Sequence, residues 1–265
     1  MIKDSLLGPA APELGWVPAP RYFMRRARIQ RLMQNVATGR LLEIGPGAGA
    51  FLVESADKGF QCEALELSTE ACKLTQAVVS QSGHAIPIHM NPVDTWEGCF
   101  DVICAFEVLE HIRDDRAALV QWLTWLKPHG VLMLSVPAHM NLWSAGDEWA
   151  GHYRRYERDT LQTLLLDTGI ELDAVECYGF PLTNLSEWLS APIYARRIHR
   201  GGLAADDIRK KNNDRSGIDR STHLKIYPLM RSIPGKLVLR ISAVIQGMFV
   251  QTDLGSGYLI KARRW

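Results

Sequence analysis

The sequence has 265 residues, of which 47% are hydrophobic and 22% are charged, a composition ordinary for a globular protein with one large α/β domain. It contains no run of about 18 uncharged apolar residues and no basic-then-apolar leader, so we expect neither a membrane span nor a secretory signal, and we predict a cytoplasmic protein. The five cysteines are scattered and never spaced Cys-x-x-Cys, which argues against a disulfide framework or a zinc knuckle.

Charge is unevenly distributed along the chain although the net charge is only +1. Residues 1–190 carry 15 Lys and Arg against 24 Asp and Glu, whereas residues 191–265 carry 15 against 5, so the two parts stand at −9 and +10. We therefore expect the C-terminal quarter to face an anionic partner or the acidic remainder of its own chain.

Residues 1–40 are predicted to form an N-terminal lead-in, with a Pro-rich extended stretch at 1–20 and a basic helix at 21–36. An apolar run at 41–44 and a glycine turn at 45–49 follow, and strands then alternate with helices in the manner of a parallel sheet. The elements predicted next are a helix from 50 to about 58, a strand at 62–66, a helix at 69–82 with Ser68 as its N-cap, a short strand at 86–89, a strand at 101–106, a helix at 115–126 and a strand at 130–136.

The C-terminal half predicts a helix at 160–168, a strand at 171–178 and a last strand at 257–263. Between residues 181 and 255 lie two apolar, basic-flanked segments, 185–199 and 224–251, joined by a polar stretch. The two segments are too short to bury a core of their own. We therefore predict one domain over residues 1–265, in which 181–250 is a helical lid insertion packed on the main body or on a ligand.

The glycine turn is the segment around which the rest of the chain is arranged. Glycine allows a positive φ and a close approach of ligand to backbone, and the free N–H groups of the following helix attract an anionic group. The turn alone does not identify the ligand, because Gly45-x-Gly47-x-x-Ala50 also fits the dinucleotide fingerprint.

The surrounding motifs decide between these ligands, because in order and spacing they resemble class I S-adenosylmethionine (SAM)-dependent methyltransferases. The resemblance is close over about residues 40–137, looser in the C-terminal strands and absent over 181–250. It implies a Rossmann-like, seven-stranded, mostly parallel sheet with helices on both faces, and SAM as cofactor with S-adenosylhomocysteine as product. The motifs are Glu43-x-Gly45-x-Gly47-x-Gly49, Glu66 after the next strand, Asp101-Val102-Ile103, Glu107-Val108-Leu109-Glu110-His111 and Leu126-Lys127-Pro128-x-Gly130.

Two carboxylates carry most of the cofactor prediction. Glu66 ends a strand 21 residues after Gly45, where it can accept hydrogen bonds from both ribose hydroxyls of SAM or of NAD. Glu43 discriminates between the two, because a carboxylate there suits an ammonium or sulfonium and would repel a pyrophosphate. Without a role in cofactor binding, Glu66 would be a solvated residue at the end of a strand, and Asp94 would be an ordinary turn residue. The cofactor contacts predicted with the resemblance are Tyr22, Arg26 (with Arg25 as the alternative), Glu43, Gly45, Gly47, Gly49, Glu66, Leu67, Asp94 and Phe106.

Methyl transfer is an in-line displacement, and many acceptors must lose a proton to a base. His111 and His152 lie in loops at the expected carboxyl edge of the sheet, and a neutral imidazole accepts a proton near neutral pH. We predict His152 as the base and His111 as the second candidate, with Tyr156 orienting the acceptor. The alternative for each histidine is a purely structural loop residue.

Glu107, Glu110 and His111 also form the pattern E-x-x-E-H, which similar methyltransferases of ubiquinone biosynthesis and of small-RNA 2′-O-methylation use to hold a divalent metal. Oxygen and nitrogen donors at this spacing suit a metal, and His152 would supply a fourth ligand. The same residues also occur where they only cap helices or pair with arginine. We therefore do not assign a metal ligand.

The acceptor predicted from these residues is a small or lipid-like molecule, methylated on oxygen or nitrogen. Two alternatives stay open: an RNA methyltransferase using the basic C-terminal quarter, and a membrane-peripheral lipid or quinone methyltransferase. A third, an NAD oxidoreductase, is disfavoured by Glu43. The residues that suit a planar or hydrophobic acceptor, and equally a plain core, are Trp143, Trp149, Tyr153, Tyr156, Phe180, Trp188 and Tyr194.

Overall fold

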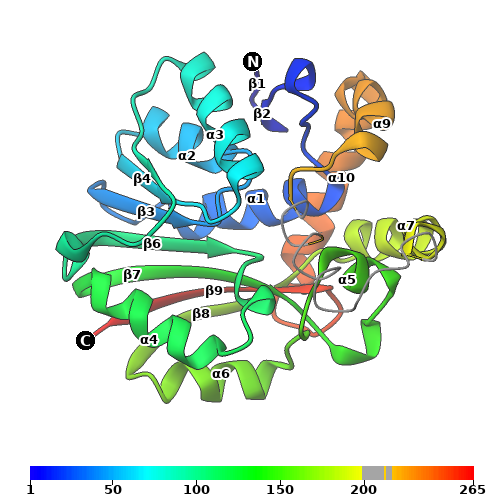
Figure 1. The fold of residues 1–265 in the computed structure, drawn as a ribbon. Helices are drawn as coiled ribbons and strands as arrows, with labels where there is room; N and C mark the ends of the chain where they lie inside the picture. The colour runs from blue at the N-terminus through cyan, green and yellow to red at the C-terminus, as the bar shows by residue number, and fades with distance from the viewer. Residues whose placement is uncertain (199–211, 213–216) are drawn as a thin grey trace.

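A computed structural model describes residues 1–198, 212 and 217–265, so most of the polar stretch predicted within the insertion lies outside the described residues. Its main feature is a seven-stranded sheet in the order β5-β4-β3-β6-β7-β9-β8 (Figure 1). Neighbouring strands are parallel except β9, which is antiparallel to both β7 and β8. This confirms the predicted seven-stranded, mostly parallel sheet, in which the last strand is the antiparallel one. The strands are β3 (Arg40–Ile44), β4 (Gln61–Leu65), β5 (Ile88–His89), β6 (Phe100–Phe106), β7 (Leu126–Pro137), β8 (Ile170–Tyr178) and β9 (Gly257–Arg264).

Both faces of the sheet are covered by helices, as predicted. The central strands are apolar in continuous runs because their two faces are both buried, as in other parallel sheets. Leu42 and Ile103 pack with α4 and α6 on one face, whereas Leu41 and Val102 pack with α1 and α2 on the other. The helices of this main body are α1 (Pro20–Leu32), α2 (Ala50–Asp57), α3 (Thr69–Ser82), α4 (Asp115–Trp125), α5 (Ala145–Ala150) and α6 (Arg158–Leu166).

The predicted N-cap of α3 is confirmed, since the Ser68 hydroxyl accepts a hydrogen bond from the Ala71 N–H at 3.4 Å. Such a cap satisfies one of the backbone donors that a helix start leaves free. The helix predicted at 21–36 ends at Leu32, four residues earlier than expected.

The Pro-rich N-terminus is not the plain extended lead-in that we predicted. β1 (Ile2–Asp4) pairs antiparallel with β2 (Gly8–Ala10), and a short 3-10 helix (Pro12–Leu14) follows. The turn between the two strands is held by the Asp4 carboxylate, which accepts hydrogen bonds from the backbone N–H groups of Leu6 and Leu7. The Leu7 side chain is fully buried.

Among the described residues, three further helices precede β9: α7 (Leu182–Ile198), α9 (Ser221–Arg231) and α10 (Ile233–Phe249). Figure 1 shows them gathered at one side of the molecule, near the carboxyl ends of the strands. The apolar segment predicted at 224–251 is two helices rather than one. The chain breaks at Ser232, whose hydroxyl caps α10 by accepting from the Gly235 N–H at 3.2 Å, and Pro234 has no N–H to continue α9.

Candidate active site

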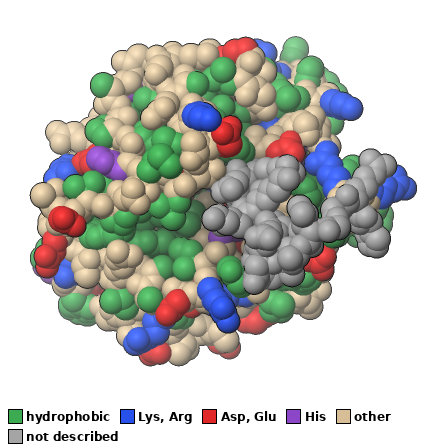
Figure 2. Space-filling model, viewed as in Figure 1, with side chains coloured by type: hydrophobic (Ala, Val, Ile, Leu, Met, Phe, Trp, Pro, Cys, Tyr) green, Lys and Arg blue, Asp and Glu red, His purple; other side chains and the backbone are tan. Residues whose placement is uncertain are grey.

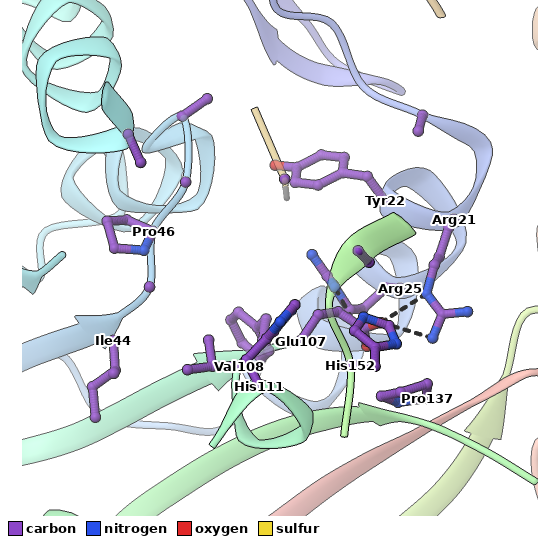
Figure 3. A pocket seen from close by; sticks show the side chains of 18 of the residues that line it. Arg21, Tyr22, Arg25, Ile44, Pro46, Glu107, Val108, His111, Pro137 and His152 are labelled. Atoms are coloured by element: carbon purple, nitrogen blue, oxygen red, sulfur yellow. Dashed lines mark hydrogen bonds and ion pairs between the residues drawn. The ribbon is translucent and has the colours of Figure 1, made fainter. Parts of the chain in front are cut away.

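A cavity of about 1150 Å³ opens where β3, β4 and β6 end, and helices α1, α5, α7 and α9 supply its other walls (Figure 3). It reaches α4 through Ala117 and Trp122, and Figure 2 shows hydrophobic side chains gathered in a hollow between α3 and α4. The predicted site residues that line the cavity are Tyr22, Arg26, Glu43, Gly45, Gly47, Glu66, Leu67, Phe106, His111 and His152.

The glycines of the turn have different tasks. Gly45, Gly47 and Gly49 all have positive φ, at 65°, 59° and 75°. A Cβ on Gly45 would lie 2.6 Å from Val108 Cγ2, whereas a Cβ on Gly47 would meet only the Gly217 carbonyl oxygen at 3.9 Å. Gly49 lies outside the cavity wall, where it is the N-cap residue of α2 and packs against Thr75. Gly45 and Gly47 thus face the cavity, and Gly49 fixes the backbone behind it.

A buried carboxylate lies below the turn. Glu43 is 4% exposed, and its Oε2 has no hydrogen-bond partner among the residues that the structure describes. Burial raises the pKa of Glu43 to about 8, although Arg25 acts in the opposite direction. The site therefore offers a carboxylate that lacks a close positive partner.

Arg25 and Arg26 are adjacent on α1 but have different partners. The Arg26 guanidinium is bound by Glu54, with Nε 2.7 Å from Oε1, and it also donates to the Leu6 carbonyl at 2.8 Å. Arg25 Nε is buried with no partner in the described part of the chain. The Arg25 guanidinium also lies 3.6 Å from Glu107 Oε1, so only its Nε side is open to a further acceptor. The geometry thus favours Arg25 Nε over the predicted Arg26 as a donor to a ligand.

Glu66 closes the other side of the turn. Its carboxylate accepts hydrogen bonds from the Gly47 N–H at 3.3 Å and from the Ser68 N–H at 2.9 Å. Leu67 is 71% exposed and lines the cavity, whereas Asp94 is exposed at the start of a 3-10 helix (Asp94–Trp96) and does not line it. Phe106, at the end of β6, packs edge-on against Phe51 with ring centroids 5.0 Å apart.

His152 enters the cavity from the loop after α5 and is held by an acid that the sequence reasoning missed. Its Nδ1 is 2.9 Å from Asp147 Oδ1, and Asp147 also accepts from the Ser144 N–H at 2.8 Å. Although burial opposes it, hydrogen bonds from His152 and Arg155 hold the pKa of Asp147 well below its usual range. The Ser144-x-x-Asp147 capping pattern was the only signal in the sequence. An ionised Asp147 keeps the proton on Nδ1 and leaves Nε2 as the basic atom.

A chain of ion pairs joins this loop to α1 and α7. Arg155 Nε donates to Asp147 at 2.8 Å, and its other end lies 3.6 Å from Glu187 of α7. Arg21 of α1 pairs with both Glu187 and Glu107, and Figure 3 shows the pairing with Glu107. Four separate segments are therefore fixed relative to one another at this end of the cavity.

The E-x-x-E-H residues divide into two groups rather than sharing one helical turn. Glu107 precedes the short 3-10 helix (Leu109–His111), has a φ of 59° and accepts hydrogen bonds from Tyr178 Oη at 2.7 Å and Ser135 Oγ at 3.0 Å. Arg21 and Arg25 overcome the effect of burial and lower its pKa. Glu107 is thus committed to these partners.

Glu110 and His111 turn instead toward His152. The ligand atoms of these three residues lie within 4.8 Å of one another, and the two imidazole rings are 4.7 Å apart. Both Glu110 oxygens and His111 Nδ1 are buried without a hydrogen-bond partner in the described residues. Burial and the neighbouring Glu107 raise the pKa of Glu110, while burial and His152 lower the pKa of His111 to about 3. His111 is therefore a weak base, and the trio can hold a metal.

Tyr156 lies outside the cavity wall. It is 5% exposed, and its hydroxyl donates to Asp115 Oδ2 at 2.9 Å. Burial and Asp115 raise its pKa. This geometry gives Tyr156 a role in anchoring the loop against α4 rather than in contacting the acceptor.

Comparison with known proteins gives one family and a consistent set of relatives. A family described as "Methyltransferase domain" matches residues 19–175. The ubiquinone biosynthesis O-methyltransferases of Xanthomonas euvesicatoria pv. vesicatoria and Xanthomonas axonopodis pv. citri are each 28% identical, over 158 and 175 residues. These matches cover 53% and 59% of this chain, and 66% and 73% of those proteins. The crystal structure of a Bacillus halodurans putative methyltransferase aligns with a TM-score of 0.57 at 14% identity, over 91% of this chain and 99% of that one, which shows a shared fold.

Proposed function

This chain belongs to the methyltransferase domain family and is a SAM-dependent methyltransferase; on that premise, we propose that it methylates oxygen or nitrogen of a small or lipid-like acceptor, with His152 as the base. The observation that carries the proposal is the His152 imidazole, oriented by Asp147 and facing the same cavity as the glycine turn. The acceptor and the cofactor would then share that cavity.

The residues of the cofactor end fit SAM. Glu43 Oε2 and Arg25 Nε are buried and lack partners within residues 1–198, 212 and 217–265, and they are the acceptor and the donor that an amino acid's ammonium and carboxylate would satisfy. Glu66 would accept from the ribose hydroxyls. When bound, SAM supplies an electrophilic methyl group on a sulfonium.

The protein's own chemistry is alignment and proton removal. The acceptor O–H or N–H would donate to His152 Nε2, which takes the proton as the acceptor's lone pair forms a bond to the methyl carbon. The bond from that carbon to the sulfonium sulfur would break at the same time, and S-adenosylhomocysteine would leave with its electron pair. Asp147 stabilises the imidazolium that forms, because it already accepts from Nδ1. The apolar walls exclude water from the reacting atoms.

Those walls support an apolar or aromatic acceptor. Leu189 and Ile193 of α7 and Ile226 of α9 line the cavity together with Trp149 of α5. A phenol attached to an apolar tail fits this lining, and the name of the curated relatives is consistent with that class. The apolar lining also fits a lid role for the 181–250 insertion, which we retain as part of the proposal.

A metal-assisted reaction is the second candidate, because one observation favours it. The unpartnered atoms of Glu110 and His111 lie beside His152 Nε2, which is 3.8 Å from Glu110 Oε1. A divalent cation held there would contact the acceptor oxygen and stabilise its negative charge, and His152 would then be a ligand. An RNA acceptor bound by the basic quarter stays a sequence prediction.

The test measures single-turnover methyl transfer from SAM to a panel of phenols, amines and polyprenyl phenols, comparing His152→Ala with His84→Ala. His84 lies at the surface beside Asp57 and serves as the matched control. We expect His152→Ala to lower the transfer rate by about 10²–10⁴ with the SAM Kd unchanged.

Two outcomes would overturn the base role. A loss under about threefold would make His152 structural. Activity that disappears with a chelator and returns with Mg²⁺ would reassign His152, with Glu110 and His111, to a metal site.

A further inference from the structure

The helix α10 is oriented with its polar residues inward. Leu239, Ser242 and Gln246 are its buried residues, and they follow one another at helical spacing. Gln246 Nε2 donates to the Met24 carbonyl of α1 at 3.0 Å, and the Gly179 N–H donates to Gln246 Oε1 at 2.7 Å. These bonds fix which face of α10 meets the protein.

The opposite face is apolar and exposed. Ile233, Leu237, Ile241, Val244 and Met248 recur at spacings of three or four residues, and each is between 51% and 88% exposed. We call these five residues the outer face of α10. A helix on a globular protein normally shows the reverse arrangement, and apolar residues gathered in this way mark an interaction surface.

The charged residues of α9 and α10 themselves all have one sign. Residues 221–249, which include both α9 and α10, contain no Asp or Glu and carry four basic residues. Lys225, Arg231 and Arg240 are exposed, and only Lys236 has an acidic partner, Asp4, in the described chain. Apolar residues bordered by cations suit a surface that is apolar inside and anionic outside.

α9, which packs against α10, and α7 also carry exposed apolar residues, and some of these line the cavity. Leu189 and Ile193 of α7 and Ile226 of α9 are between 39% and 58% exposed, and all three also line the cavity. Trp188, beside them on α7, is 72% exposed. No helix in the described residues is long and apolar enough to cross a bilayer.

We propose that the outer face of α10, with the exposed apolar residues of α7 and α9, docks the enzyme on an anionic lipid bilayer, with the apolar side chains in the headgroup region. A second copy of the chain is a poorer occupant, because a symmetric interface would bring Arg231 and Arg240 of both copies together. Nucleic acid is poorer still, since phosphates gain nothing from the exposed apolar side chains. A lipid-like acceptor would enter the cavity directly from the bilayer.

The test is cosedimentation with phosphatidylcholine vesicles, with and without phosphatidylglycerol. The face variant Leu237→Ser/Val244→Ser is compared with Val120→Ser/Leu166→Ser, which removes apolar side chains of similar exposure from α4 and α6. We expect the parent and the control variant to bind the anionic vesicles, and the face variant to bind at least about tenfold more weakly. Arg231→Gln/Arg240→Gln should lower binding to the anionic vesicles by a similar factor and leave the weak binding to neutral vesicles unchanged.

Thermal unfolding and calorimetric titration with SAM establish that each variant is folded. Because vesicle binding is measured without an acceptor, its result is independent of the proposed reaction. The proposal is overturned if the parent does not bind anionic vesicles, or if the face and control variants bind equally. It is also overturned if sedimentation shows a dimer that only the face variant disrupts while no vesicle binding occurs.

Discussion

The two ends of the cavity are built by different parts of the chain and by different means. At the proposed cofactor end, the neighbouring strands β3 and β4 stop beside one glycine turn, and Glu66, directly after β4, accepts a hydrogen bond from the Gly47 N–H. At the acceptor end, side chains from α1, β6, α5 and α7 meet through ion pairs, such as Arg21 with Glu107 and Glu187.

This difference predicts how the two ends respond to substitution. Changes at the cofactor end remove hydrogen-bonding atoms from a frame that the sheet keeps in place, so they should weaken binding. Changes at the acceptor end remove the partners that orient a reacting group, so they should slow the reaction while SAM still binds.

The largest effect is expected for Asp147→Asn. Asp147 Oδ1 accepts from His152 Nδ1 and Arg155 Nε, and Oδ2 accepts from the Ser144 N–H. An amide has one acceptor oxygen and no negative charge, so it cannot serve both sides, and the imidazole loses the group that orients it and stabilises its protonated form. We expect kcat to fall by about 10²-fold or more with the SAM Kd unchanged. Glu148→Gln, one residue away and exposed, is the control. Equal rates for the two variants would remove Asp147 from the proposed mechanism.

Glu66→Ala, at the proposed cofactor end, should change the SAM Kd rather than kcat. The variant loses a charged acceptor for the ribose hydroxyls, each such bond being worth about 1.5–3 kcal/mol, so the SAM Kd should rise at least about tenfold. Glu70→Ala, on the exposed first turn of α3, is the matched control for calorimetry. An unchanged Kd, or tight binding of NAD by the parent, would contradict the cofactor assignment.

Gly49→Ala separates backbone geometry from ligand contact. Its φ of 75° strains any residue with a Cβ, and that Cβ would lie 2.8 Å from Thr75 Cγ2. We expect the free energy of unfolding to fall by about 1–3 kcal/mol, measured by denaturant titration. Gly83→Ala, also at positive φ but with open space around its Cβ, should cost less. If both variants are equally stable, packing behind the turn is unimportant.

The strands and the glycine turn of the proposed cofactor end could be predicted because their information is local. The turn follows β3 and Glu66 follows β4, so both could be placed from the residues next to them in the chain. The choice between Arg25 and Arg26 was not local, since it depends on Glu54 in another helix binding Arg26. The helix spacing placed both arginines on α1 and could not tell which acid each would meet, Glu107 for Arg25 and Glu54 for Arg26.

The acceptor end was predicted less completely for the same reason. His152 was chosen for its loop and its neighbours, but Asp147 is recognisable only once α5 brings its carboxylate to Nδ1. Tyr156 was predicted to orient the acceptor because it lies in the same loop as His152. Its hydroxyl instead donates to Asp115 on α4, outside the cavity. The helix boundary at Ser232 could have been predicted, because a serine followed by a proline in the first helical positions favours a helix start. We did not predict it because the residues on both sides form one continuous apolar segment.

The last prediction concerns Glu43, and its sign follows from its pKa. Burial raises the folded-state pKa to about 8, above the value of about 4.3 in an unfolded chain, so the folded protein retains a proton that the unfolded chain loses. Without SAM, stability should therefore fall as the pH rises from about 4 towards 8. Glu43→Gln carries no such proton and should be more stable than the parent at about pH 8, by at least about 1 kcal/mol. The same variant should bind SAM more weakly, because the cofactor's positive charge favours the ionised carboxylate. Thermal melts of both proteins across this pH range provide the check, and parallel profiles would show that Glu43 does not titrate there.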